Sequence, residues 1–215
     1  MLLIPFKKIA HNTSWFQVFR DLPEVSLREV SWPAFPYCPE VRFKIAHDGL
    51  CIYLEYQVRE QQILARYRRV NEPVYKDSCV EFFLSFDQEH YYNMEFNALG
   101  TALVGYGKNK KGERQRLSSE RIGQIEVRSS LAEDKAAYTI AASSWSLQLK
   151  IPKSLFYYHP QLVLEGSQGF ANFYKCGDDL KEPHFVAWKK VNTLEPDFHQ
   201  PASFGTVLFG QIPKC

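Results

Sequence analysis

Hydrophobic and polar residues alternate along most of the chain, and residues 50–58 show the pattern most clearly. Successive side chains of a β-strand point to opposite faces, so a period of two predicts a strand. We expect one set to face a core: Leu50, Ile52, Leu54, Tyr56 and Val58. The intervening set should face the other way: Cys51, Tyr53, Glu55 and Gln57. This segment is therefore expected to be a strand buried on one face.

Similar runs predict eight further strands, at 41–45, 80–86, 92–98, 137–142, 145–151, 170–175, 184–188 and 205–209. No capped helical pattern of ten or more residues is found, although residues 152–155 can open a single turn after a strand. Strands without crossover helices favour antiparallel pairing. The pattern predicts an all-β fold, an antiparallel β-sandwich of jelly-roll or immunoglobulin-like architecture with at most short helical turns.

Prolines at positions 23, 33, 36 and 39 cluster in the second half of the first 40 residues. Proline fixes its backbone and cannot donate a hydrogen bond, which is typical of edge segments. We expect an extended N-terminal arm over 1–40 that crosses the edge of the sandwich. No repeat or linker divides the rest, so residues 1–215 are expected to form one domain.

The charge of the chain is nearly balanced, with 26 Lys and Arg against 24 Asp and Glu. A net charge of +2 gives no long-range field for a polyanion, so nucleic acid is not expected as a partner. No segment is apolar and long enough to span a membrane, and the start, MLLIPFKKIA, lacks the order of a secretory signal. We expect a cytoplasmic protein, or an extracytoplasmic one if a leader is missing.

The five cysteines are widely spaced and contain no C-x-x-C pair. This spacing indicates neither a zinc site nor a disulfide framework, and most of the cysteines are expected to be small buried residues.

Residues 77–101, DSCVEFFLSFDQEHYYNMEFNALGT, have the pattern of a β-hairpin. Side chains of one parity are apolar and should face the core: Val80, Phe82, Leu84, Phe86, Tyr92, Met94, Phe96 and Ala98. If the turn centres on Glu89, Glu81 lies opposite Asn97, and Glu81 and Glu95 are diagonal neighbours. Carboxylates and carboxamides on a rigid sheet suit sugar hydroxyls, which both donate and accept hydrogen bonds. The alternative is an ordinary solvated sheet face.

A second segment, residues 171–191, combines polar side chains with one tryptophan. Lys175, Asp178 and His184 precede Trp188, whose flat ring complements the C–H face of a pyranose. A tryptophan in a strand is more often part of a core. Its lysine neighbours at 189 and 190 favour a partly exposed edge.

These segments together resemble the family 9 carbohydrate-binding modules, particularly family-9-like proteins that stand alone. The matching text is DSCVEFFLSF at 77–86, YYNMEFNALGT at 91–101, WSLQLKIPKSLF at 145–156, ANFYKCGDDLKEPHFVAW at 171–188 and PDFHQPASFGTVLF at 196–209. The resemblance implies a β-sandwich with a slot in which two aromatic side chains hold a sugar of an oligo- or polysaccharide.

Carried over by position, Trp188 matches one wall of that slot, and Tyr75 is the nearest aromatic residue for the other wall. Glu81 and Asn97 match positions that bind hydroxyls. We therefore expect non-catalytic binding through Trp188, Tyr75, Glu81, Glu95 and Asn97, with a rim of Lys175, Asp178 and His184. No cofactor is expected, apart from the structural calcium that the resemblance implies. Its ligands would come from Asp87 with Glu89, or from Asp178 with Asp179.

Two other functions stay open. A glycoside hydrolase needs two carboxyl groups about 5 to 9.5 Å apart, and Glu81 and Glu95 meet that spacing as sheet neighbours. A flat polar face offers little of the apolar cover that raises the pKa of a catalytic acid. The other alternative is a structural or protein-binding sandwich whose sugar site has decayed.

Overall fold

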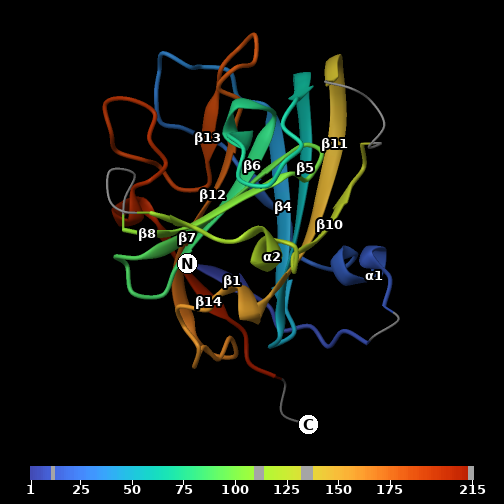
Figure 1. The fold of residues 1–215 in the computed structure, drawn as a ribbon, viewed down its shortest axis with the longest axis vertical. Coiled ribbons are helices and arrows are strands. Elements are labelled where there is room, and N and C mark those ends of the chain that lie inside the picture. The colour runs from blue at the N-terminus through green and yellow to red at the C-terminus, as the bar shows by residue number, and fades with distance from the viewer. Residues whose placement is uncertain (11–12, 109–113, 132–137, 213–215) are drawn as a thin grey trace.

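Two β-sheets packed face to face make up the protein (Figure 1). The computed structural model describes residues 1–10, 13–108, 114–131 and 138–212. Within these ranges the fourteen strands form one sheet of nine and one of five, and both helices are short. The predicted all-β sandwich is confirmed.

The nine-stranded sheet is mainly antiparallel, and only its β1–β14 pair is parallel among the described strands. Its order is β1 (Leu2–Ile4), β14 (Gly205–Phe209), β12 (Gln168–Cys176), β6 (Cys79–Ser85), β7 (Tyr91–Asn97), β8 (Ala102–Gly107) and β9 (Gln115–Arg116). Two short strands extend it from β12, namely β13 (Phe185–Ala187) and β3 (Glu29–Val30).

The five-stranded sheet is antiparallel and contains the two longest described strands. Its order is β10 (Glu126–Ser129), β11 (Tyr138–Pro152), β5 (Cys51–Ala65), β4 (Glu40–His47) and β2 (Val25–Leu27). The runs at 137–142 and 145–151, predicted as two strands, belong to the single strand β11, and residue 137 lies outside the described residues.

Among the described residues, helical structure is confined to short segments, as predicted. They are α1 (Trp15–Phe19), α2 (Ser119–Ile122) and the 3-10 turns η1 (Val74–Lys76), η2 (Lys153–Leu155) and η3 (Pro201–Ser203). The turn expected over 152–155 is η2. In α1, the Ser14 side chain accepts from the backbone of Gln17, whose own side chain accepts from the Ser14 backbone; this reciprocal pair fixes the start of the helix.

The N-terminal 40 residues contribute to both sheets. Strand β1 pairs with β14, β2 pairs with β4, and β3 pairs with β13. Trp32 then lies buried on the outer face of the larger sheet. The segment is therefore tied to the sandwich at three separate edges.

The main core lies between the two sheets, and the hairpin residues predicted to face it do so. Val80, Phe82, Leu84, Tyr92, Met94, Phe96 and Ala98 are fully buried there, and Phe86 packs against them. On β5, Ile52, Leu54, Tyr56 and Val58 also face this core. Leu50 does not: it is 68% exposed, because β5 begins at Cys51 and Leu50 lies in the preceding turn, where its N–H donates to Asp48.

A second layer of apolar side chains covers the outer face of the nine-stranded sheet, and we call it the outer cluster. It consists of Trp32, Val74, Cys79, Phe83, Tyr91, Leu103, Tyr174, Cys176, Ala187, Val191 and Phe198. This face was open to interpretation as an ordinary solvated surface, but every residue of β6 and β7 is buried. Burial of both faces also explains why β8 was missed, since its ALVG segment shows no alternation.

Candidate functional site

The two glutamates of the hairpin lie directly opposite each other, in a register different from the predicted one. Glu81 on β6 pairs with Glu95 on β7, and Cys79, not Glu81, pairs with Asn97. The prediction placed the turn at Glu89, whereas the observed pairs are centred on position 88. The two carboxyl groups are thus closer neighbours than expected.

The hairpin turn itself explains this register. Gln88 has a φ of 68°, in the left-handed region, and the Asp87 side chain accepts the backbone N–H groups of Glu89 and His90. The Ser85 hydroxyl donates to the carbonyl of His90. An aspartate side chain is short enough to accept hydrogen bonds from the backbone N–H groups that follow it, and this is a turn signal. The centre of the turn could therefore have been placed from Asp87.

A cleft of about 390 Å³ opens over Glu81 and Glu95 on the outer face of the nine-stranded sheet. Strands β6 to β9, turn η1, strand β13 and the 191–200 loop all contribute to its walls. Its lining residues are Tyr75, Glu81, Asn93, Glu95, Gly105, Arg114, Arg116, Cys176, Asp178, Phe185, Pro196, Asp197, Phe198 and His199.

Glu95 is the most unusual group in the cleft. Its Oε1 accepts a hydrogen bond of 2.8 Å from Asn93 Nδ2, while its Oε2 is buried and has no hydrogen-bond partner among the described residues. Burial raises the pKa of Glu95 to about 7, against the opposing effects of the Asn93 hydrogen bond and of Arg116 and Arg114. A buried acceptor without a donor is costly, so this atom calls for an explanation.

Arg114 holds Asn93 in place from the opposite side. Its guanidinium lies 4.1 Å from the centre of the Tyr91 ring and donates to Asn93 Oδ1 and to the carbonyls of Tyr91 and Gly107. Gly105 leaves the room for this contact, because a Cβ there would lie 2.7 Å from Asn93 Oδ1. Asn93 thus donates to Glu95 in a fixed orientation.

Three aromatic rings supply the apolar part of the cleft. Phe198 is mostly covered, because it stacks on Tyr174 with ring centres 4.0 Å apart. Tyr75 from η1 and Phe185 from β13 are only partly buried. These two rings therefore offer the accessible apolar surface of the cleft.

Trp188 lies outside the cleft. Val186 on β13 and Trp188, which directly follows the strand, both meet the main core, where Trp188 packs edge-to-face on Phe173 with ring centres 5.7 Å apart. Lys189 Nζ lies 4.4 Å from the centre of the Trp188 ring. The cleft-facing aromatic of this strand is Phe185, and the alternation in FVAW carried that information.

Lys175 and His184 are also outside the cleft, fully buried between the sheets. Lys175 shares the inward parity of Phe173 on β12, and its Nζ lies 2.8 Å from Glu60 Oε2 on β5 and 2.7 Å from His184 Nε2. Trp145 Nε1 donates to the other Glu60 oxygen at 2.6 Å. Burial and the adjacent ammonium hold the pKa of His184 far below its usual value, at about 2. This network links the two sheets.

Asn97 has an internal role too. Its Nδ2 donates to the Tyr67 carbonyl and to Asp77, and its Oδ1 accepts the N–H groups of Leu99 and Thr101.

Four of the eight predicted site residues, namely Tyr75, Glu81, Glu95 and Asp178, meet in the cleft. Asn93, Arg114 and the residues of the 191–200 loop were missed, and the loop carried no periodic signal that could have placed it.

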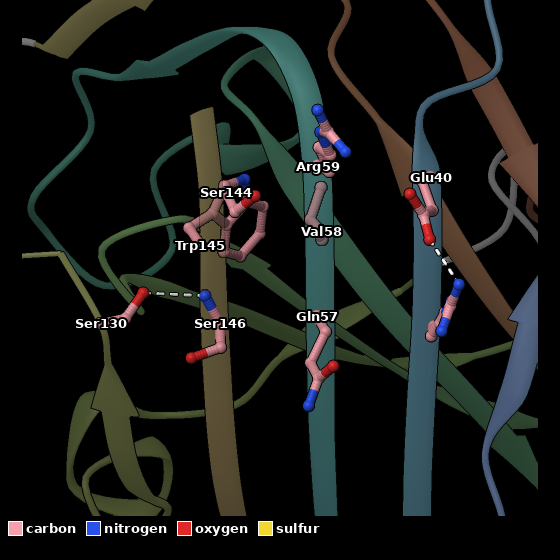
Figure 2. Close-up of a pocket in the computed structure, with 9 residues that line it drawn as sticks. Glu40, Gln57, Val58, Arg59, Ser130, Ser144, Trp145 and Ser146 are labelled. Carbon is pink, nitrogen blue, oxygen red and sulfur yellow. Dashed lines mark hydrogen bonds and ion pairs between the residues drawn. The ribbon is translucent and has the colours of Figure 1, made fainter. Parts of the chain in front are cut away.

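A second groove, of about 430 Å³, lies on the five-stranded sheet (Figure 2). Figure 2 shows Glu40 on β4 and Gln57 and Arg59 on β5 along this groove. Arg42 is paired with Glu40 and Glu24. The single aromatic residue among its lining residues, Trp145, is buried and bonded to Glu60. The groove thus lacks an accessible ring, and the cleft is the better candidate site.

The residues expected to hold calcium do not fit that ion. The carboxylate of Asp87 accepts the turn N–H groups and pairs with His90, and that of Asp179 pairs with Arg66 at 2.8 Å. Calcium requires six to eight oxygen ligands, and the described residues at these two places do not offer such a set.

The chain was compared with known proteins. A model described as carbohydrate-binding family 9 matches residues 16–209. The chain belongs to carbohydrate-binding family 9. No match was found among curated proteins. No helix among the described residues is long and apolar enough to cross a membrane.

Solved structures of similar fold include members of this family. A candidate carbohydrate-binding protein from Bacteroides uniformis ATCC 8492 is 35% identical, with a TM-score of 0.87 over 97% of this chain and 99% of that one. A family 9 module from Caldicellulosiruptor kristjanssonii in complex with cellotriose is 12% identical, with a TM-score of 0.64 over 99% and 94%. The module from that organism with glucose is 11% identical, with a TM-score of 0.64 over 100% and 97%. The latter two show the fold alone.

Proposed function

We propose that the chain binds a carbohydrate in the cleft over Glu81 and Glu95 and does not cleave it. The observation that carries the proposal is the buried, unpartnered Oε2 of Glu95, at a site built from acids, an amide and partly exposed rings. Sugar hydroxyls can supply the missing donor and accept from neighbouring groups at the same time. Membership of a carbohydrate-binding family supports this ligand class.

Tyr75 and Phe185 supply the stacking surface in this proposal. Their rings are the partly exposed aromatic groups of the cleft, and aromatic faces complement the C–H side of a sugar ring. Arg116 and Asp178, which also line the cleft, contact further hydroxyls. A glucose-type oligosaccharide is the first ligand to test, because family members of the same fold have been solved with cellotriose and glucose.

Glycoside hydrolysis is the second candidate, because one specific observation favours it. Glu81 and Glu95 face each other across β6 and β7, and burial raises the pKa of Glu95 to about 7, as a general acid requires. The burial of a carboxyl group that the sequence did not indicate is therefore present. Release of reducing ends from cellotriose, lost in both Glu81→Gln and Glu95→Gln, would establish this activity in place of simple binding.

The binding proposal is tested by calorimetric titration of glucose, cellotriose and xylo-oligosaccharides into the wild-type chain, Glu95→Gln and Glu40→Gln. Glu40 belongs to the groove on the other sheet and is the matched control. We expect saturable binding that Glu95→Gln weakens about tenfold, in line with loss of a hydrogen bond to a carboxylate. Binding that Glu40→Gln weakens and Glu95→Gln leaves unchanged would place the site in the groove and refute the proposal.

A further inference from the structure

Two cysteines far apart in the sequence meet at the floor of the cleft. Cys79 on β6 and Cys176 on β12 are directly opposite in the β6–β12 ladder, and both are buried. Their Sγ atoms and a carboxylate oxygen of Glu81 all lie within 4.8 Å of one another. Cys176 Sγ lies 3.2 Å from Glu81 Oε1. Because strand pairing brings them together, the spacing of the cysteines along the chain could not reveal the cluster.

The separations in this cluster are close to those of a tetrahedral metal site. With Zn–S bonds of ~2.3 Å and Zn–O bonds of ~2.1 Å, tetrahedral ligand atoms are about 3.6 to 3.8 Å apart. The three atoms lie within 4.8 Å of one another, so shifts of about an ångström would bring them to these separations. Two thiolates and one carboxylate are a donor set that suits zinc and other thiophilic ions better than calcium or magnesium.

We propose that Cys79, Cys176 and Glu81 bind one thiophilic divalent cation of the zinc class, whose fourth coordination position opens into the cleft. Cys176 and Glu81 line the cleft and Cys79 lies behind them, so the fourth ligand comes from the cleft side as a water or a hydroxyl. Zinc sites with three protein ligands and one exchangeable ligand have this arrangement. The site does not depend on sugar binding, since all three ligands belong to the chain.

Metal binding at this site must release protons. Burial raises the pKa of the Cys79 thiol to about 12 and that of Cys176 well above its usual value. Because zinc binds thiolates, a bound cation displaces the thiol protons. Among the charged groups around the thiols, the carboxylates of Glu95 and Asp178 favour the binding of a cation, and the buried ammonium of Lys175 opposes it.

The test uses cobalt(II) and zinc(II) with the full chain, its thiols kept reduced by a phosphine. Tetrahedral thiolate coordination gives cobalt a ligand-to-metal charge-transfer band, which zinc abolishes by displacement. The variants are Cys79→Ser, Cys176→Ser and Glu81→Gln. Cys51→Ser is the matched control, because Cys51 is a buried cysteine that packs near α1 and not in the cleft. Circular dichroism establishes that each variant is folded.

We expect one cobalt ion per chain, with a charge-transfer band that either cysteine variant loses and Cys51→Ser retains. Glu81→Gln should keep a thiolate band but bind more weakly. Absence of the band in the reduced wild-type chain would overturn the proposal. So would a band that persists in folded Cys79→Ser and Cys176→Ser. A chain that binds cobalt but no sugar would refute the proposed function and leave the metal site standing.

Discussion

Glu81 and Glu95 form a directly opposed cross-strand pair of buried carboxyl groups at the centre of the cleft. Asn93 bonds one oxygen of Glu95, and no described group bonds the other. An apolar pair would pack there at lower cost, since like acids on a sheet disfavour each other. The pair therefore weakens the fold locally, as expected of a polar arrangement kept for a ligand in the proposed function.

The free energy of unfolding should depend on pH through Glu95. The pKa of Glu95 is raised by burial from its usual 4.5 to about 7, so the folded state holds this proton more tightly than the unfolded state. Its contribution to stability is complete below pH 4.5 and is lost as the pH rises to about 7. Glu95→Gln stays uncharged and should lose less stability over this range. Urea unfolding at pH 4.5, 6 and 8 measures the difference, and parallel pH profiles would contradict the raised pKa.

Gly105→Ala should weaken sugar binding about tenfold with the fold intact. The added Cβ would lie 2.7 Å from Asn93 Oδ1, so Asn93 would shift and its hydrogen bond to Glu95 would be disturbed, at a cost of ~1 kcal/mol or more. Calorimetric titration with cellotriose measures the change. Gly123→Ala, at the end of α2 and away from the cleft, is the control and should bind like the wild-type chain. Equal affinities in all three proteins would contradict the role of Asn93.

Lys175→Met should destabilise the protein by about 3 to 5 kcal/mol, because it leaves the buried Glu60 carboxylate without its cation. Lys108→Met is the matched control. Lys108 pairs with Glu89 at a similar distance of 2.9 Å, but both side chains are exposed, so the expected loss is about 0 to 1 kcal/mol. Chemical denaturation of the three proteins gives the values. Similar losses in the two variants would show that the buried pair is not structural.

Phe185 and Trp188 should respond differently to replacement by leucine. Phe185→Leu removes a cleft ring and should weaken sugar binding about three- to tenfold. Trp188→Leu should instead lower the free energy of unfolding and leave affinity unchanged, because Trp188 packs on the main core. Titration and denaturation of both variants test this. Loss of binding in Trp188→Leu alone would restore the sequence-based assignment of Trp188 as a wall of the site.

The alternation of apolar residues was sufficient to predict the sandwich and the inward face of the hairpin, because burial between two sheets imposes a period of two. The same rule places Lys175 and Trp188 inward within the predicted strands 170–175 and 184–188, whereas residue chemistry assigned both to the site. Lys175 is fully buried because it pairs with Glu60, and Trp188, which is partly exposed as expected, packs on Phe173. Such pairings depend on which strands become neighbours.

The predicted register of the hairpin was wrong for a local reason. The cleft walls were not predicted for a non-local reason. A turn assumed one residue too late, at Glu89, shifts every cross-strand pair by two positions, which changed the relation of Glu81 to Glu95. Phe198 and His199 come from an irregular loop that is folded over the sheet. No periodic pattern marks such a loop, so its part in the site emerges only from the tertiary structure.

A crystal structure of the chain grown with cellotriose tests the central claim most directly. The account predicts a sugar ring in the cleft, with a hydroxyl within hydrogen-bond distance of Glu95 Oε2 and the ring against Tyr75 or Phe185. A sugar bound in the groove beside Trp145 and Arg59, or a cleft that stays empty while cellotriose binds saturably in solution, would contradict it.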